Sequence, residues 1–219
     1  MMLRALMLVS LLLPALAWSA PPGPRETIQS AIEIMVGKIQ KERQRLEAEP
    51  DYARELVRQE LVDLVDFKRI TRLVMAEYFE QATREQKYAF LEVFRNSLIN
   101  TYASGITLYD GQQIRVLPLE DGDVRAGRAR VRTELAANDG RLVPVYFSLY
   151  QNPEGAWLVE NVIVNGLNLG KTFRAQFQQS MQQYGDIDKV IANWSAELDV
   201  EQEKAKEAAG TAGQGSDGA

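Results

Sequence analysis

The hydrophobic period of the chain changes near Asp110–Gly111, and this change constrains the fold more than any other feature of the sequence. Before it, apolar residues recur every three or four positions, the spacing of helices that bury one face. After it, segments such as 128–135 alternate between polar and apolar residues, as Arg130 and Val131 illustrate. This alternation is typical of a half-buried strand. Helices followed by consecutive strands predict an α+β fold with a curved antiparallel sheet.

Four helices are predicted before the change. The first covers residues 25–48, and Asp51 and Asp66 are expected to cap the next two. Thr83 and Gln86 have the spacing of a capping box, in which each side chain binds a free backbone N–H at the start of the fourth helix. With about 25 residues at about 1.5 Å each, this helix would be roughly 35–40 Å long, enough to run the length of a domain.

About four strands joined by short turns are predicted after the change. Residues 120–123 are expected to form the first turn, and residues 138–140 and 152–155 have the composition of hairpin turns. A helix is expected to start at Asn168 or the residue after it, and Asp186 is expected to cap a short last helix. The sheet is therefore a meander with helices on one face, and the cone shape of NTF2-like proteins is one form it could take. The predicted strands cover residues 113–119, 128–135, 141–150 and 156–166.

The segment 142–149 is apolar on both faces. Val145 and Phe147 would lie on one face. Pro144 and Tyr146 would lie on the other, whereas antiparallel strands usually keep one face polar. Burial in an ordinary core explains this pattern. A second explanation is that one face, of either parity, lines a dry cavity for an apolar ligand, with a few polar groups at its mouth.

The composition excludes several classes of chemistry. The chain has no His and no Cys, which removes thiol nucleophiles, Cys-bound zinc, Ser-His-Asp triads and the commonest general base. We therefore expect neither a cofactor nor a metal site, and an enzyme on this chain would have to use carboxylates, Lys or Tyr. The formal net charge of −5 makes nucleic acid an unsuitable partner.

Residues 1–19 have the features of a secretory signal peptide. Arg4 supplies a positive charge, residues 5–13 form a short apolar run, and small residues offer a cleavage site after Ala17 or after Ser19. The run is too short to remain as a membrane span. A secretory signal without a disulfide framework fits a bacterial periplasm better than a eukaryotic secretory route. The sequence therefore predicts export to the periplasm of a Gram-negative bacterium.

The rest of the chain divides into one domain and a tail. Residues 20–200 contain all the predicted helices and strands, without an internal repeat or an interdomain linker. Residues 201–219 are rich in Ala, Gly and charge and have no large apolar side chain. Such a segment cannot bury a core, so it is expected to be disordered.

Four stretches of the sequence form a specific combination when they are taken in chain order. They are VDFKRITRLVM (65–75), TREQKYAFLEVFRNSLINTYASGITLY (83–109), PVYFSL (144–149) and WLVENVIVNGLNLGKTFRAQF (157–177). Together they resemble the successive motifs of the MlaC family of periplasmic phospholipid-binding proteins, also called the toluene-tolerance family. The sequence departs from the family pattern at Asn161 and Asn165, where Asp and Glu are frequent, and at Phe173, where Tyr is frequent.

The resemblance implies a soluble carrier, not an enzyme, that holds phospholipid by its acyl chains. Such carriers pass lipid between an outer-membrane lipoprotein–porin complex and an inner-membrane ABC transporter with its substrate-binding subunit. They contribute to the lipid asymmetry of the outer membrane and to organic-solvent tolerance. The domain of residues 20–200 is then a lipid-binding domain.

The physical chemistry of acyl chains is consistent with a carrier. Two chains carry about 30 methylene-equivalents, and exposing them to water costs on the order of 24 kcal/mol at roughly 0.8 kcal/mol each. An empty rigid cavity of about 1,000 Å³ would be just as unfavourable, at about 24 cal/mol per Å³, and this exceeds the whole stability of a domain. We therefore expect the protein either to retain lipid or to bring its helices inward when it is empty.

Candidate site residues come from the apolar stripes and from the charges beside them. Each one is also compatible with an ordinary core position or a solvated helix face. The predicted lipid-binding residues are Phe67, Ile70, Leu98, Tyr102, Ile106, Val145, Phe147, Val162, Val164, Phe173 and Phe177. The predicted head-group or docking residues are Lys68, Arg69, Arg72, Lys171 and Arg174.

Two other functions fit the same composition. In a carboxylate-based NTF2-like enzyme, Glu160 or Glu134 would act as a base in an apolar pocket, where burial raises the pKa of a carboxyl group. In a lipid-free periplasmic adaptor, the apolar surface would bind partner proteins. The adaptor requires a solid core, whereas the carrier requires a cavity.

Overall fold

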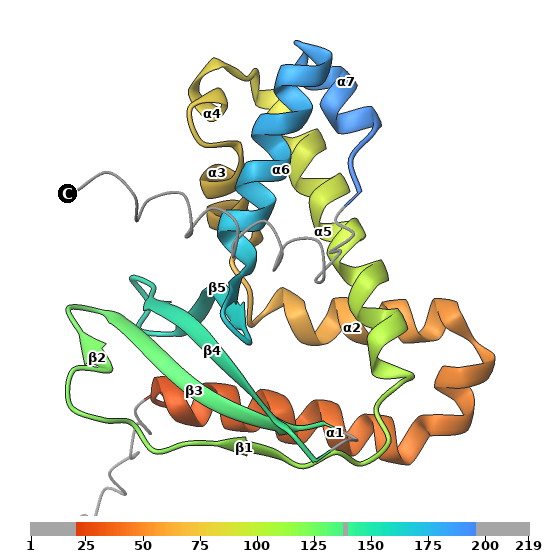
Figure 1. Ribbon diagram of the computed structural model, residues 1–219, viewed down its shortest axis with the longest axis vertical. Helices are drawn as coiled ribbons and strands as arrows, with labels where there is room; N and C mark the ends of the chain where they lie inside the picture. The colour runs from red at the N-terminus through yellow and green to blue at the C-terminus, as the bar shows by residue number, and fades with distance from the viewer. Residues whose placement is uncertain (1–20, 138–139, 196–219) are drawn as a thin grey trace, which may run out of the picture.

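The computed structural model describes residues 21–137 and 140–195, which form seven helices and six strands (Figure 1). The helices are α1 (Pro24–Ala48), α2 (Pro50–Val62), α3 (Phe67–Met75), α4 (Tyr78–Gln81), α5 (Arg84–Ile106), α6 (Leu169–Tyr184) and α7 (Ile187–Ala192). The strands are β1 (Ile114–Val116), β2 (Val124–Arg125), β3 (Arg128–Ala136), β4 (Leu142–Gln151), β5 (Trp157–Val164) and β6 (Leu167–Asn168). The predicted signal peptide, most of the 138–140 turn and the predicted tail lie outside the described residues. Within these ranges, no helix is both long and apolar enough to cross a membrane.

The strands form one antiparallel sheet in the order β1-β3-β4-β5-β6, and β2 pairs with the start of β3. This confirms the predicted α+β fold with a meander sheet. The four predicted strands are β1, β3, β4 and β5, and the sequence did not indicate the two-residue strands β2 and β6. β1 is shorter than predicted because Pro118, inside the predicted range, has no N–H to continue the ladder.

A β-bulge in β5 changes which residues share a face of the sheet. Val159 and Asn161 pair with successive residues of β4, so Glu160 is an extra residue in the strand. Bulges of this kind bend a strand and re-aim a side chain. Val159 and Val162 therefore lie on the same face although they are three positions apart.

The helices cover one face of the sheet. At one end Ile28 of α1 packs in a buried cluster with Val131 of β3. At the other end Phe67 of α3 belongs to a cluster that Val162 of β5 borders. Figure 1 shows α1 along the strands, α3, α6 and α7 grouped at the opposite end of the molecule, and α5 running between the two parts. The other face carries the polar series of β3, such as exposed Arg130.

The buried apolar residues form three clusters rather than one. The helical cluster joins α3, α5, α6 and α7 and is centred on Phe90, Phe94 and Phe177, with Trp194 packed against it. The second cluster joins α1 to the sheet, and the third joins α1, α2 and α5. Val162 borders both the first and the second cluster. The candidate site lies where these clusters meet.

Three of the four predicted helix caps are confirmed. Asp66, Thr83 and Asp186 each accept a hydrogen bond from the backbone N–H three residues further on. Asn168, one of the two predicted starts of the α6 helix, caps that helix in the same way, and α6 begins at Leu169. Thr83 also forms the reciprocal bond of a capping box. α5 contains 23 residues, close to the predicted length, so it spans the distance between the helical cluster and α1.

The predicted cap of α2 is wrong. The helix begins at Pro50, preceded by Glu49, and Asp51 lies in its first turn, where it pairs with Arg54. Proline favours the first helical position because its φ is already helical and its missing N–H would have had no partner there. The proline therefore starts the helix two residues before the start that an Asp51 cap would give.

Candidate functional site

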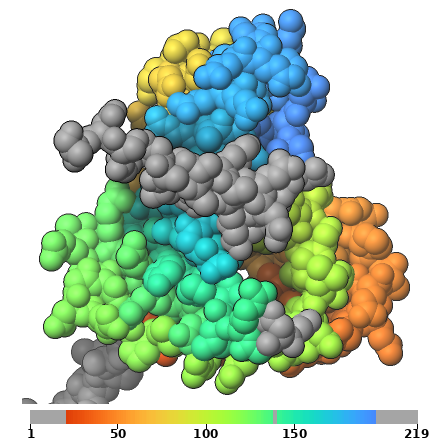
Figure 2. Space-filling view, viewed as in Figure 1, coloured from red at the N-terminus to blue at the C-terminus, as the bar shows by residue number. Residues whose placement is uncertain are grey.

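An apolar cavity of about 270 Å³ lies between the sheet and helices α3, α5 and α6. Valine, leucine, isoleucine and phenylalanine side chains dominate its wall. In the space-filling view, the surface is hollowed between the strands and α5 (Figure 2). The lining residues are Leu61, Leu64, Val65, Phe67, Ile70, Phe94, Leu98, Tyr102, Val145, Phe147, Val159, Glu160, Asn161, Val162, Val164, Leu169, Gly170 and Phe173. A larger groove of about 400 Å³ near α2 includes charged side chains such as Glu47 and Arg54, so it is less suited to an apolar ligand.

The structure brings most of the predicted lipid-binding residues to this cavity. Those on its wall are Phe67, Ile70, Leu98, Tyr102, Val145, Phe147, Val162, Val164 and Phe173. Two predicted residues lie elsewhere. Ile106 packs against the cluster of α1, α2 and α5, and Phe177 is fully buried in the helical cluster. Each continues the apolar stripe of its helix past the end of the cavity.

The pairing register resolves which strand face lines the cavity. Val145 and Phe147 lie opposite Val164 and Val162, and all four are on the cavity wall. Tyr146 lies on the other face, where the Arg130 guanidinium carbon is 5.5 Å from the centre of its ring. The second apolar face of β4 is therefore covered in part by arginine side chains from β3, which the alternation in β3 supplies.

Several lining residues were not predicted. Leu64 and Val65 follow α2 instead of continuing it, and Val65 forms a parallel bridge with Val159. The Val159 N–H donates to the Leu64 carbonyl at 2.8 Å. This short segment thus extends the cavity wall beside β5. Its apolar residues were visible in the sequence, but they fitted the stripe of the preceding helix.

Tyr102 places a polar group inside the apolar wall. Its side chain is 40% exposed, yet burial raises the pKa of its hydroxyl. Both observations fit a residue on the cavity wall, because one side of the ring faces the cavity while protein atoms surround the rest of the side chain. Tyr102 has no hydrogen-bond partner among the described residues, so the hydroxyl is available to a polar group of a ligand.

An ion-paired cluster lies beside the cavity. Glu160, which is 9% exposed, accepts from Nε of Arg69 at 2.5 Å and also from Arg128. The Arg69 guanidinium carbon lies 4.2 Å from the centre of the Tyr150 ring. Tyr150 donates to the Asp66 carboxylate, and desolvation together with this bond raises its pKa to about 12. The cluster ties α3 to β3, β4 and β5.

Neither carboxylate proposed for an enzyme has the setting of a general base. Both oxygens of Glu160 already accept from arginines, so neither is free to take a proton from a substrate. Glu134 pairs with Arg115 at 2.7 Å and is not part of the cavity wall. In the described part of the chain, no group of three or more His, Cys, Asp or Glu side chains could hold a metal ion.

The predicted head-group or docking residues do not form one group. Arg69 is beside the cavity, through its bond to Glu160. Arg72 pairs with Glu80 at 3.0 Å and Arg174 with Glu77 at 3.6 Å. The remaining two predicted residues, Lys68 and Lys171, are exposed.

Asn161 connects β5 to the start of α6. Its Oδ1 accepts from the Gly170 N–H at 2.9 Å, and its Nδ2 donates to Oδ1 of Asn168 at 3.1 Å. A Cβ at Gly170 would lie 2.7 Å from Asn161 Oδ1, so the glycine permits this close approach. An aspartate at 161 could accept from Gly170 but could not donate to Asn168, which gives the asparagine at this position a physical reason.

The fold and the cavity together define a class of protein: a small α+β domain that encloses an apolar space between a meander sheet and a layer of helices. Comparison with known proteins identifies the family. The family model described as MlaC protein matches residues 29–196, and the chain belongs to the MlaC family. This confirms the resemblance found in the sequence.

Two curated relatives and one solved structure illustrate the relationship. The chain is 34% identical over 209 residues to the toluene tolerance protein ttg2D of Pseudomonas putida, and the match covers 94% of each protein. It is 25% identical over 152 residues to the intermembrane phospholipid transport system binding protein MlaC of Haemophilus influenzae, covering 68% of this chain and 71% of that protein. The phospholipid-binding protein of Ralstonia solanacearum, solved with a phospholipid, superposes with a TM-score of 0.72 at 24% identity, covering 85% of this chain and 99% of that one. This last likeness concerns the fold.

Proposed function

We propose that the protein is a soluble periplasmic carrier that binds phospholipid by its acyl chains. It passes lipid between an outer-membrane lipoprotein–porin complex and an inner-membrane ABC transporter with its substrate-binding subunit. The observation that carries this proposal is the apolar cavity between the sheet and α3, α5 and α6. The names of the two curated relatives, a toluene tolerance protein and a phospholipid transport system binding protein, support it.

The cavity gives acyl chains an apolar surface between the sheet and α3, α5 and α6. Moving an acyl chain from water to such a surface is favourable by roughly 0.8 kcal/mol per methylene group. We expect the cavity to widen on loading, through movement of the helices away from the sheet, because each further methylene that enters adds to this gain.

The polar groups beside the cavity suit the head-group end of a phospholipid. The Arg69 side chain pairs with Glu160 and is still 36% exposed, so its guanidinium can also donate to the phosphate of a head group. Tyr102 offers a donor inside the wall for an ester oxygen. No step in this function requires a nucleophile or a base, in keeping with a chain that lacks His and Cys.

A pair of substitutions on adjacent residues of β5 tests the proposal. Val162 lines the cavity, whereas Ile163 lies on the other face of the same strand, opposite Tyr146. We expect Val162→Arg to lose lipid but stay folded, because the arginine can place its charge in the widened cavity. We expect Ile163→Arg to retain lipid. The measurement is mass spectrometry of lipid extracted from each protein purified from a periplasm.

Two outcomes would contradict the carrier. The first is a wild-type protein that holds no phospholipid after isolation and takes up none from vesicles. The second is a Val162→Arg protein that unfolds while Ile163→Arg stays folded, since a solid core, as in an adaptor, predicts that result. Circular dichroism of both variants separates loss of lipid from loss of fold.

A further inference from the structure

A second cleft, of about 260 Å³, lies between α3, α4 and the first turns of α5. It shares no lining residue with the apolar cavity. α3 separates the two spaces, because Phe67 and Ile70 line the cavity while Lys68 and Thr71 line the cleft. The cleft is lined by Lys68, Thr71, Phe79, Arg84, Lys87, Tyr88 and Leu91.

Positive charge gathers at the cleft, and no lining residue is acidic. Lys68, Arg84 and Lys87 form no ion pair within residues 21–137 and 140–195. Of the carboxylates in the neighbouring segments, Glu77 pairs with Arg174 and Glu80 with Arg72, and exposed Glu85 in the first turn of α5 is not part of the lining. Three cations thus surround one small space on a protein whose formal net charge is −5. The occupant that matches this charge is an anion.

The cleft also offers aromatic surface and an unsatisfied hydroxyl. Lys87 Nζ lies 4.6 Å from the centre of the Phe79 ring, and the Arg84 guanidinium carbon lies 5.7 Å from that of Tyr88. Tyr88 is 51% exposed. Thr71 is 1% exposed, and its Oγ1 has no hydrogen-bond partner in the described residues. A buried hydroxyl without a partner is unfavourable, and a ligand atom that accepts its hydrogen bond would remove this cost.

We propose that this cleft is a second binding site, separate from the cavity, for a phosphate monoester carried on an apolar group. One carboxylate carries a single charge, and one cation is enough to pair with it. A phosphate monoester carries about −1.5 to −2 and has three acceptor oxygens, so it matches three cations and a free donor. The apolar group of the ester packs against Tyr88 and Phe79. Soluble phosphate esters and head groups at a bilayer surface are two sources of this chemistry.

Phenyl phosphate is a suitable probe for the site. Titrated into the isotope-labelled protein and followed by NMR, it should shift backbone amides of α3, α4 and the first turns of α5. We expect a dissociation constant on the order of a millimolar for a ligand of this size, and about tenfold weaker binding of benzoate. Shifts that map to another surface, or no shifts at all, would overturn the site.

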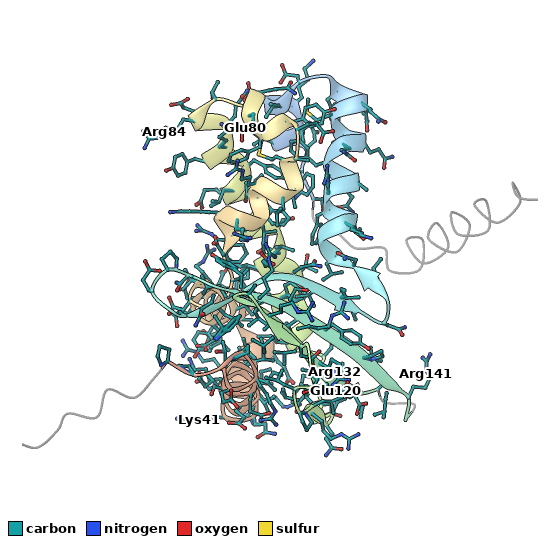
Figure 3. All side chains as sticks on the ribbon, turned by 90° about the vertical axis from the view of Figure 1, so that its left-hand side faces the viewer. Lys41, Glu80, Arg84, Glu120, Arg132 and Arg141 are labelled. Atoms are coloured by element: carbon teal, nitrogen blue, oxygen red, sulfur yellow. The ribbon has the colours of Figure 1, made fainter. Side chains whose placement is uncertain are left out.

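Substitutions separate a built site from general attraction between charges. Lys87→Gln and Arg84→Gln should each weaken phenyl phosphate binding about tenfold. Lys41→Gln removes the same charge from exposed Lys41 of α1, at the opposite end of the molecule from Arg84 (Figure 3), and should weaken it less than about twofold. Equal effects of Lys41→Gln and Lys87→Gln would refute the proposal. Tyr88→Ala should weaken the binding of phenyl phosphate but not that of inorganic phosphate. Equal losses of affinity for both ligands would contradict a contact between Tyr88 and the apolar group of the ester.

Vesicles distinguish the two sources of the ligand. If the site binds head groups, the protein should sediment with phosphatidylcholine vesicles that contain phosphatidate but not with pure phosphatidylcholine, and Lys87→Gln should abolish the difference. If it binds soluble esters, phenyl phosphate should bind while neither vesicle does. Val162→Arg should leave phenyl phosphate binding unchanged, so failure at the cavity and failure at the cleft can be told apart.

Discussion

The helical cluster and the cavity are built from the same kinds of side chain, but they differ in packing. In the helical cluster the Phe90 ring centre lies 4.8 Å from that of Phe177 and 4.9 Å from that of Trp194, both edge to face. Around the cavity, phenylalanine and valine side chains of α3, α6, β4 and β5 leave about 270 Å³ unfilled. The side chains of the helical cluster pack against other protein atoms, whereas those of the cavity wall face a space that a ligand can fill.

A single helix contains both environments. On α6, Phe173 lines the cavity and Phe177, one turn further on, has no exposed surface. On α5, Leu98 lines the cavity and Ile106, two turns further on, packs against the cluster of α1, α2 and α5. Hydrophobicity thus determines that a side chain is buried, and the arrangement of neighbouring elements determines what it is buried against.

The largest expected effect is the loss of stability when each of the two phenylalanines of α6 is truncated. Phe177→Ala should lower the free energy of unfolding by about 3–5 kcal/mol, because it opens a void in a close-packed cluster. Phe173→Ala should lower it by about 1–3 kcal/mol, because one side of that ring already faces a space. Urea unfolding of the lipid-free proteins measures both. Equal losses would mean that the two phenylalanines are packed alike.

A smaller effect comes from adding volume to the two regions. Val162→Phe should raise the stability of the lipid-free protein by about 0.5–2 kcal/mol, because the ring fills part of the cavity, and it should reduce lipid uptake. Val190, which is 1% exposed in the helical cluster, is the matched control. Val190→Phe should lower stability by about 1–3 kcal/mol through overpacking. Thermal unfolding and lipid uptake from vesicles check both, and a destabilising Val162→Phe would contradict an unfilled space.

The elements of this fold follow from local signals, which is why most of them could be predicted. The capping box at Thr83, the alternation in β3 and the asparagine cap of α6 each depend on residues close in sequence. The face of β4 that lines the cavity depends on its register with β3 and β5, and the bulge at Glu160 interrupts the alternation in β5. A residue such as Val159 was therefore absent from the predicted wall.

The polar groups of the site were harder to predict because their partners are distant in sequence. Glu160 of β5 joins Arg69 of α3 to Arg128 of β3, and nothing near any of the three indicates the others. The sequence therefore suggested a catalytic role for Glu160 and a head-group role for five separate cations. The structure leaves Arg69 beside the cavity and assigns salt bridges to Arg72 and Arg174.

The smallest expected effect is a pH dependence of stability, and it concerns the ionisable cluster beside the cavity. Tyr150→Phe removes the bond to Asp66 and should lower stability by about 1 kcal/mol near neutral pH. The pKa of Tyr150 is raised to about 12, whereas an unfolded tyrosine ionises near pH 10. The unfolded wild type therefore loses this proton first as pH rises, so wild-type stability falls across this window and the gap to Tyr150→Phe should narrow. Urea unfolding of both proteins, at neutral pH and then above about pH 10, measures the gap. A gap that stays constant or widens would show that the bond to Asp66 does not stabilise the cluster.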